Sequence, residues 1–312
     1  MDNLRVGNIE VIIGEKGGRF PFGNTLFIDD QVKVVVDPGA GLQKLAGLKQ
    51  RSRVDLVLNT HYHLDHIAFN YLFDRSDIYA SELESGCYRR LEEIALRYGF
   101  DEVYGSGWIP RWIARISDPG TPASPYSLQN RHEWVLSTAR LDGVIRWGEE
   151  LSFGSTEMEV VGAPGHTAGF CCLYFPHERA VYTGDIDLTD FGPWYVKDGD
   201  IDDFIASARK IADLPASTFI TGHELGVLSR EEFLPRLERY LRVIDERDRR
   251  ILEVLDQPAR LEEVVDRGLI YPRRYHIDDW IRAFEVIMTK KHLARLQEKK
   301  LVGCDQGYYV AL

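Results

Sequence analysis

Six consecutive residues combine four side chains that can bind a metal ion. They are His61, Tyr62, His63, Leu64, Asp65 and His66. They follow the apolar segment 55–60, which is expected to form a buried strand. Because side chains alternate between the two faces of an extended segment, His61 and His63 point the same way. Asp65 and His66 come next in a predicted turn, and two pairs of ligands with different directions indicate a site for two divalent cations.

Three further candidate ligands stand where later predicted strands end. His166 lies in a turn, Asp185 follows the predicted strand 180–183, and His223 follows the predicted strand 218–221. A glycine beside each of them permits the unusual backbone angles of a loop that converges on an ion. Since one rim would then receive seven ligands, the pattern favours a metal site over seven unrelated side chains.

The elements that must position these residues alternate between strands and helices. Strands are predicted at 9–13, 25–28, 32–36, 55–59, 77–80, 144–147, 151–153, 158–161, 170–175, 180–183 and 218–221. Helices are predicted at 42–49, 67–73, 84–98 and 202–212. This alternation is typical of an α/β layered domain.

Residues 82–145 interrupt the alternation and are predicted to form an insertion. After the predicted helix 84–98, glycine, proline and serine punctuate residues 105–127. Its aromatic side chains are Tyr88, Tyr98, Phe100, Tyr104, Trp108, Trp112, Tyr126 and Trp134. They either cover the end of the domain that holds the site or pack against the core, and both interpretations stay open. A structural role is expected for His132.

The chain changes character after residue 228, which predicts a catalytic domain at 1–228 and a C-terminal module at 229–312. Helices are predicted at 230–256, 260–266 and 278–298, followed by a terminal hairpin. Helices followed by a hairpin outline a winged-helix-like module. It could form a substrate wall, a dimer surface or a nucleic-acid module. His276 and His292 are expected to be solvated or capping residues, not metal ligands.

The charge distribution weighs against a nucleic-acid partner. The net charge is −11. Residues 1–228 hold 21 basic and 33 acidic side chains, a net −12, whereas residues 229–300 carry +2. A polyanion would therefore meet an acidic catalytic domain and an almost neutral module. A small-molecule substrate is expected, and a homodimer is possible.

Cysteine spacing and hydropathy predict a cytoplasmic protein without a membrane partner. The four cysteines show no spacing of a disulfide framework, and Cys171 and Cys172 are neighbours on opposite faces of a predicted strand. No secretory signal is visible, and no apolar run approaches the roughly 20 residues of a membrane span. Hydrophobic residues make up 44% of the chain, enough for a sizeable core.

The histidine motif and the later ligands resemble the metallo-β-lactamase superfamily over about residues 8–228. The motif HxHxDH is present as His61 to His66, and the single ligands follow in the family's order. This resemblance implies an αββα sandwich with two metal ions at one end of the facing sheets. It implies that the first ion is bound by His61, His63 and His166. The second ion would be bound by Asp65, His66 and His223, and both ions would share Asp185. Asp37 matches an acidic residue that supports the ligand loops from behind.

The resemblance implies hydrolysis by a hydroxide held between the two ions, which attacks the carbonyl of an ester, thioester or lactone. Asp65 is the predicted catalytic residue, because it holds the second ion. Imidazole and carboxylate ligands fit zinc and also admit iron or manganese. Two alternatives remain: a phosphodiesterase or ribonuclease of the same fold, and a mononuclear iron oxidoreductase that acts on sulfur compounds.

A loop with two aromatic side chains follows the predicted bridging aspartate. Trp194 and Tyr195 lie a few residues after Asp185 and are predicted to line the rim of the substrate pocket. Such a pocket would suit a partly apolar ester, thioester or lactone. The alternative is a packed loop that closes the sandwich.

Overall fold

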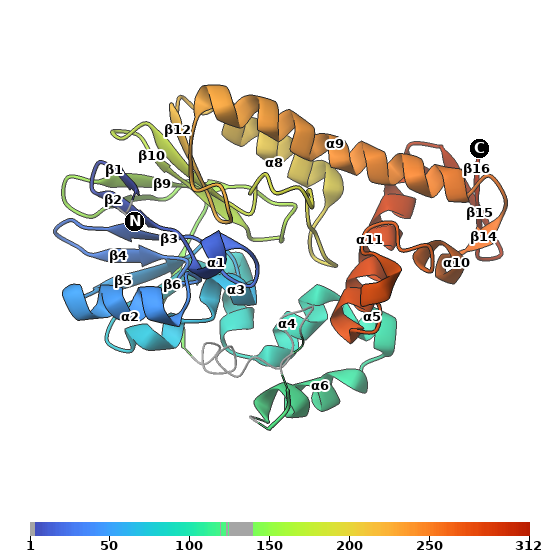
Figure 1. The fold of residues 1–312 in the computed structure, drawn as a ribbon, viewed down its shortest axis with the longest axis horizontal. Helices are drawn as coiled ribbons and strands as arrows, with labels where there is room; N and C mark the ends of the chain where they lie inside the picture. Colours follow the sequence, from blue (N-terminus) through green and yellow to red (C-terminus); the bar gives the residue numbers. More distant parts are fainter. Residues whose placement is uncertain (1–3, 119, 123, 125–139) are drawn as a thin grey trace.

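Two facing β-sheets flanked by helices form the main body of the computed structural model (Figure 1). The structure describes residues 4–118, 120–122, 124 and 140–312, so His132, Tyr126 and Trp134 lie outside the described residues. The helix α2 (Leu42–Arg51) covers the outer face of one sheet, and α8 (Ile201–Asp213) covers that of the other (Figure 1). The predicted αββα sandwich is confirmed.

The first sheet has seven strands and the second has six. The first, in spatial order, consists of β1 (Leu4–Val6), β2 (Ile9–Ile12), β3 (Thr25–Ile28), β4 (Val34–Val36), β5 (Leu56–Asn59), β6 (Asp77–Ser81) and β7 (Gly143–Ile145). The second consists of β13 (Val227–Ser229), β12 (Thr218–Thr221), β11 (Ala180–Gly184), β10 (Cys171–Phe175), β9 (Glu157–Gly162) and β8 (Glu150–Ser152).

Strand direction brings the candidate ligands to one rim. β4 pairs with β5 in parallel, and β11 pairs with β12 in parallel. Parallel neighbours end at the same edge of a sheet, so the residues that follow these strands converge. Between the sheets, a fully buried cluster that includes Val36, Leu58, Leu173 and Ile220 fixes their spacing and therefore the rim.

Shorter elements connect the strands, and two predicted helices are wrong in detail. The predicted helix 67–73 is replaced by α3 (Leu64–Ile67) and the 3-10 helix η1 (Asn70–Phe73). The predicted helix 84–98 divides into η2 (Glu82–Tyr88) and α4 (Leu91–Tyr98). α4 ends at Gly99, whose φ of 86° suits glycine. A further short turn is α1 (Glu15–Gly18).

The insertion contains more helix than its composition predicts. After Gly99 come α5 (Phe100–Tyr104) and α6 (Trp108–Ser117), so helical structure continues into the region that glycine, proline and serine punctuate. α6 buries Ile109, Trp112 and Ile116, a spacing that places all three on one helical face. Pro110 does not prevent this helix, because it lies in the first turn, where no backbone donor is lost.

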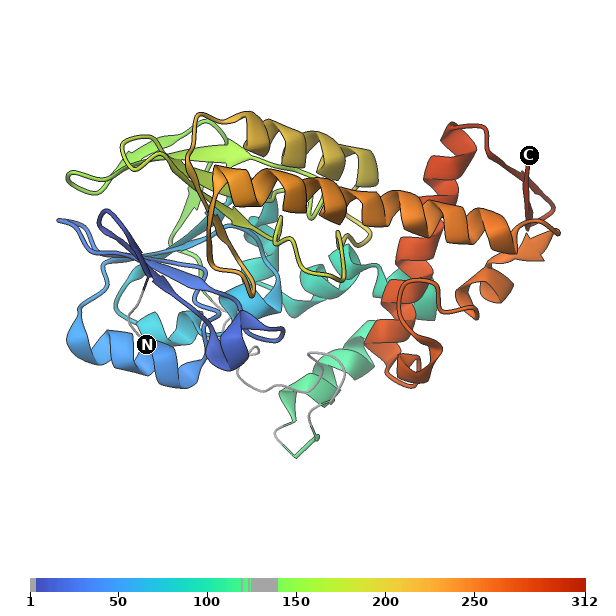
Figure 2. The same cartoon turned by 45° about the horizontal axis from the view of Figure 1, so that its top comes forward.

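The C-terminal residues form three α-helices, one 3-10 helix and a small sheet. They are α9 (Arg230–Val254), α10 (Leu261–Val265), the 3-10 helix η3 (Arg273–Tyr275) and α11 (Asp279–Glu298), with the sheet β14 (Ala259–Arg260), β16 (Tyr308–Ala311) and β15 (Val302–Asp305). Figures 1 and 2 show α9 running across the second sheet and beyond it to the small sheet. The winged-helix-like character of this region stays a prediction.

The C-terminal helices share hydrophobic cores with the rest of the chain. Trp280 and Phe284 of α11 belong to the same buried cluster as Ile94 and Tyr98 of the insertion. The proposed boundary between residues 228 and 229 stays a prediction, and the helices beyond it pack directly against the rim. Among the described residues, no helix has both the length and the apolar character that a membrane span requires.

Candidate metal centre

Histidine and aspartate side chains meet at the rim in three overlapping groups, and the ligand atoms within each group lie within 4.8 Å of one another. The first is His61, His63, His166 and Asp185; the second is Asp65, His66 and His223; the third is Asp37, His61 and His66. All seven predicted ligands are therefore brought together, and the predicted support residue Asp37 adjoins them.

Ring nitrogens face one another in the first group. The Nε2 atom of His166 lies 2.8 Å from Nδ1 of His63 and 3.0 Å from Oδ2 of Asp185. The Nε2 atom of His61 is buried and, among the described residues, has no hydrogen-bond partner. A buried nitrogen without a partner is costly, and a cation between these lone pairs would remove that cost. The donor set therefore fits a metal ion.

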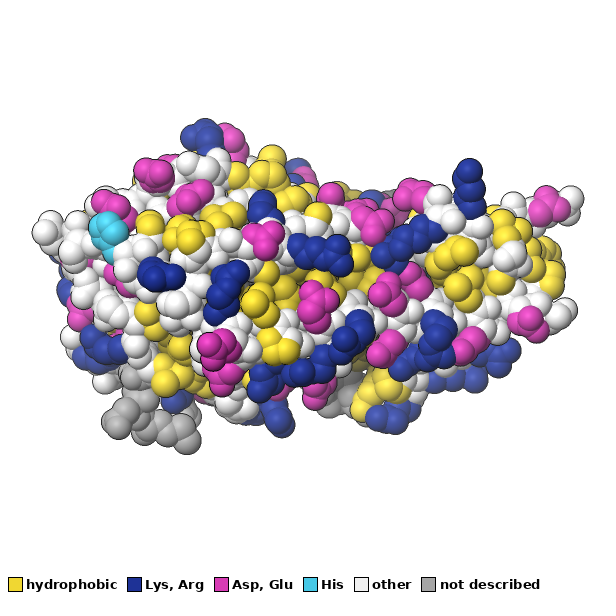
Figure 3. All heavy atoms as spheres, turned by 90° about the horizontal axis from the view of Figure 1, so that it is seen from above, with side chains coloured by type: hydrophobic (Ala, Val, Ile, Leu, Met, Phe, Trp, Pro, Cys, Tyr) yellow, Lys and Arg dark blue, Asp and Glu magenta, His cyan; other side chains and the backbone are white. Residues whose placement is uncertain are grey.

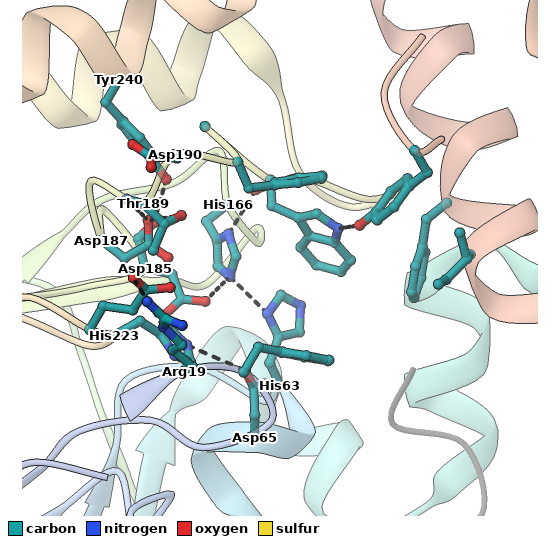
Figure 4. Close-up of a pocket in the computed structure, with 18 of the residues that line it drawn as sticks. Arg19, His63, Asp65, His166, Asp185, Asp187, Thr189, Asp190, His223 and Tyr240 are labelled. Carbon is teal, nitrogen blue, oxygen red and sulfur yellow. Dashed lines mark hydrogen bonds and ion pairs between the residues drawn. The ribbon is translucent and has the colours of Figure 1, made fainter. Parts of the chain in front are cut away.

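Asp185 faces both ligand groups with separate carboxylate oxygens. Its Oδ2 atom lies near His166, whereas its Oδ1 atom lies 2.8 Å from Nε2 of His66 and 3.5 Å from Nε2 of His223. The Nε2 atom of His223 in turn lies 3.4 Å from Oδ2 of Asp65. Figure 4 shows Asp185 with His166, His223 and the other labelled ligands at one end of a pocket. Asp185 therefore lies between the two ligand groups, and its role as a bridge between two ions stays a prediction.

Asp37 is fully buried directly behind the ligands. Its Oδ2 atom accepts hydrogen bonds from His66 Nδ1 at 3.0 Å, Thr60 Oγ1 at 2.7 Å and Tyr182 Oη at 3.1 Å. Its Oδ1 atom accepts one from the Thr60 backbone nitrogen at 2.8 Å. Asp37 therefore fixes the orientation of His66 and joins the two sheets. Sequence reasoning did not identify Thr60 and Tyr182, because nothing local marks them.

The Asp37→Ala variant is expected to bind zinc about 10- to 100-fold more weakly, because His66 loses the partner of its ring N–H. Equilibrium dialysis against zinc measures this. Asp30→Ala is a matched control, since Asp30 also accepts several hydrogen bonds, from Ser155 and Thr156 in a turn away from the rim. Equal zinc affinity in the two variants would contradict the role given to Asp37.

Backbone carbonyls orient two further ligands. His166 Nδ1 donates to the carbonyl of Trp194 at 2.8 Å, and His223 Nδ1 contacts the carbonyls of Gly18 and Phe22 at 3.1 Å. Since a carbonyl only accepts, each ring carries its proton on Nδ1 and presents Nε2 to the site. Burial also lowers the pKa of His61 to about 4. The His61 imidazole is therefore available as a neutral ligand near neutral pH.

A cavity of about 460 Å³ adjoins the ligands. Trp194 lines it, and its ring centroid lies 4.9 Å from that of His63. The prediction for Tyr195 is wrong: its side chain is 0% exposed and points away, with its hydroxyl 2.6 Å from His292 Nε2. Successive side chains of an extended segment point to opposite sides. Of the inserted aromatic residues that the structure describes, only Tyr98 lines the cavity.

Residues 18–223 match the family model described as the metallo-beta-lactamase superfamily. The chain belongs to this superfamily. Two solved structures share the fold over nearly the whole chain. A metallo-beta-lactamase family protein from Thermus thermophilus, TTHA1429, is 19% identical, with 98% of this chain and 99% of that chain covered at a TM-score of 0.68. A beta-lactamase domain protein from Burkholderia ambifaria is 17% identical, with 100% and 94% covered at a TM-score of 0.65.

Curated relatives include two hydrolases. Hydroxyacylglutathione hydrolase of Brucella anthropi is 26% identical over 181 residues, 57% of this chain and 51% of that protein. Acyl-coenzyme A thioesterase MBLAC2 of Bos taurus is 26% identical over 200 residues, 58% of this chain and 63% of that protein. The match to this chain thus spans less than two thirds of the length of each of these two proteins. Family, relatives and ligand cluster together identify a metallo-β-lactamase-like metallohydrolase.

In this superfamily member, the C-terminal helices hold the loop that orients His166. Arg247 of α9 donates to the carbonyls of Phe191 and Pro193, at 2.6 and 2.5 Å. The indole nitrogen of Trp194 donates to Tyr271 Oη at 2.7 Å. The position of the Trp194 carbonyl, and through it that of the metal ligand His166, therefore depends on residues far along the chain.

Neither C-terminal histidine belongs to the three ligand groups, but the solvated or capping role expected for His292 is wrong. His292 is fully buried, and its Nδ1 atom donates to Asp248 at 2.6 Å, which leaves Nε2 to accept from Tyr195. Burial among apolar helices explains why it is paired instead of solvated. His276 is partly exposed and contacts the Tyr271 carbonyl at 2.9 Å.

A buried carboxyl group that sequence reasoning missed supports the His166 loop. Glu84 Oε1 accepts hydrogen bonds from the Thr167 hydroxyl and from the backbone nitrogen of Gly169. Burial raises the pKa of Glu84 to about 8, so the group is mostly protonated at neutral pH. No sequence signal marks this burial, because an isolated glutamate is normally exposed.

The raised pKa of Glu84 predicts a pH-dependent stability. Its contribution is complete below the ordinary pKa of glutamate and is lost as pH rises through about 8. The free energy of unfolding should therefore fall between pH 5 and pH 9, and Glu84→Gln should reduce this fall, since the amide stays neutral. Urea denaturation at both pH values measures the effect. The exposed Glu82→Gln is the control, and an equal fall in both variants would contradict the assignment.

Proposed function

We propose that the chain is a dinuclear metal-dependent hydrolase that cleaves carboxylic esters, thioesters or lactones. The observation that carries the proposal is the pair of oxygens of Asp185, one facing each ligand group. When bound, two divalent ions would supply an activated water as nucleophile and polarise the attacked carbonyl. The ligands contain imidazole and carboxylate but no thiolate, which supports zinc and admits iron or manganese.

The residues of the chain have distinct tasks in this proposal. His61, His63 and His166 would hold one ion, and the other would be held by Asp65, His66 and His223, with Asp185 shared. The buried carboxylate and carbonyls behind the rings keep this geometry in place before substrate binds.

The lining of the cavity supports a carbonyl substrate over a phosphodiester. Beyond the ligands, it contains the acidic side chains of Asp187, Asp190 and Glu224. Among its described residues, Arg19 has the one permanent positive charge. On the face shown in Figure 3, basic and acidic side chains are interspersed. A polyanion would find no continuous basic surface there, so the ribonuclease alternative has less support.

Metal analysis combined with a substrate panel tests the proposal. The expected result is two zinc ions per chain after purification with zinc, and turnover of a thioester, an aryl ester or a lactone. Bis(p-nitrophenyl) phosphate and a β-lactam should be hydrolysed far more slowly. One tightly held iron per chain would favour the mononuclear oxidoreductase instead, and preferred cleavage of the phosphodiester would favour the phosphodiesterase.

A further inference from the structure

The cavity beside the metal centre has two chemically different ends. One end holds the metal ligands and, as Figure 4 shows, the polar side chains of Asp187, Thr189 and Asp190. The other end is apolar, and we call it the aromatic chamber. Its lining residues are Tyr98, Trp194, Trp280, Ile281 and Phe284. They come from the insertion, the loop after Asp185 and α11, so the chamber exists only in the folded chain.

The walls of the aromatic chamber contact one another closely. The ring centroid of Phe284 lies 5.1 Å from that of Trp194 and 5.6 Å from that of Tyr98. Tyr98 and Trp280 lie 5.8 Å apart. All three pairs have the edge-to-face geometry that aromatic side chains favour. The side chains that line the chamber are therefore packed against one another before any ligand binds.

The aromatic chamber opens directly onto the metal ligands. The ring of His63 lies 4.9 Å from Trp194 and 5.5 Å from Tyr98. A carbonyl placed at the metal centre would thus have one substituent in the chamber and the other toward the acidic end. A polar substituent in the chamber would lose its hydrogen bonds to water, whereas a hydrocarbon substituent gains by leaving water.

We infer that the aromatic chamber binds the acyl group of the substrate and selects apolar acyl chains of several carbons over acetyl. This inference rests on the proposed hydrolysis of carboxylic esters, thioesters or lactones. Each methylene that enters the chamber contributes about 0.8 kcal/mol, which is about a four-fold gain in kcat/KM. The gain ends when the chamber is full. Phe284 and Ile281 of α11 are specificity-determining residues.

A series of thioesters of N-acetylcysteamine, with straight acyl chains from two to twelve carbons, tests this inference on the zinc-loaded protein. The wild-type kcat/KM is expected to rise about four-fold per methylene, reach an optimum and then fall. Phe284→Ala enlarges the chamber and should move the optimum to longer chains. Ile281→Phe fills it and should move the optimum to shorter chains, which keeps the test decisive if Phe284→Ala does not fold.

Ile287→Ala is the matched control. Ile287 is buried in the same helix and the same hydrophobic cluster as Phe284 but does not line the cavity. It should lower stability and leave the optimum chain length unchanged. An optimum at acetyl would contradict the acyl-binding role of the aromatic chamber. The same optimum in wild type, Phe284→Ala and Ile281→Phe would contradict it as well. Failure of the proposed function would give a different result from failure of this inference, because no ester, thioester or lactone would then be hydrolysed at any chain length.

Calorimetry gives a readout that does not depend on turnover. Straight-chain carboxylates from four to ten carbons, the products of the proposed reaction, should bind the zinc-loaded wild type about four-fold more tightly per added methylene. The Phe284→Ala variant should lose part of this gain, and Ile287→Ala should keep it. Affinity that is independent of chain length in the wild type would exclude an acyl-binding role for the chamber.

Discussion

The Asp65→Ala variant is expected to lose kcat/KM by roughly 10³-fold while the protein stays folded, because a metal ion acting as a Lewis acid contributes several kcal/mol to catalysis. Asp65 lies in the group with His66 and His223, and its carboxylate is 3.4 Å from the His223 ring nitrogen. Without it, two histidines and one oxygen of Asp185 remain for the second ion. Elemental analysis should find close to one metal ion per chain, with kcat/KM measured on the best substrate of the panel.

Asp190→Ala is the matched control for Asp65→Ala. Asp190 lines the same cavity, is exposed, and belongs to none of the three ligand groups. It should retain two metal ions per chain and a rate within a few-fold of wild type. If Asp65→Ala also retained two ions and its rate, the dinuclear mechanism would be wrong and Asp65 would be a structural residue.

The metal ligands could be predicted from the sequence because their signals are local. Alternation along a strand gives His61 and His63 a common direction, and a glycine beside each of the later ligands marks the turns that end the strands. Parallel pairing of the strands then brings these turns to one rim, as the structure shows for β11 and β12. The alternation of strands and helices predicts an α/β layered domain. The αββα arrangement of the layers is implied by the resemblance to the superfamily.

The walls of the cavity could not be predicted, because they depend on packing between distant segments. Trp280 and Phe284 face Tyr98 from a helix almost 200 residues later in the chain. Nothing in their spacing distinguishes a cavity wall from an ordinary core. The error for Tyr195 has a similar cause, because its side chain is held by a hydroxyl contact with His292 and the adjoining backbone by Arg247, both of which lie far along the chain.

The C-terminal helices lie against the metal centre in the structure. The sequence leaves three roles open for them: a substrate wall, a dimer surface or a nucleic-acid module. α11 supplies lining residues of the cavity, and α9 supplies Arg247 beneath the Trp194 loop. These contacts favour the substrate wall. They also couple the C-terminal fold to the metal centre through the Trp194 carbonyl, which accepts from His166.

The Arg247→Met variant is expected to lower the free energy of unfolding by about 3–5 kcal/mol, since two hydrogen bonds from a charged donor contribute about 1.5–3 kcal/mol each. Arg247 is only 3% exposed, and its removal leaves the carbonyls of Phe191 and Pro193 without this donor. Methionine fills much of the same space, so the loss reports on the hydrogen bonds more than on a cavity. Urea denaturation of the zinc-loaded protein measures it.

Arg247→Met should also weaken zinc binding about ten-fold, because the loop that carries the Trp194 carbonyl no longer fixes the ring of His166. Arg249→Met is the matched control: Arg249 lies in the same helix, is exposed, and pairs with Glu253 on the surface. It should change stability by less than about 0.5 kcal/mol and leave zinc affinity unchanged. A loss of stability in Arg247→Met with wild-type zinc affinity would show that α9 supports the loop without orienting the metal ligand. Parallel losses of stability and zinc affinity would establish that α9 positions the metal centre through the Trp194 loop.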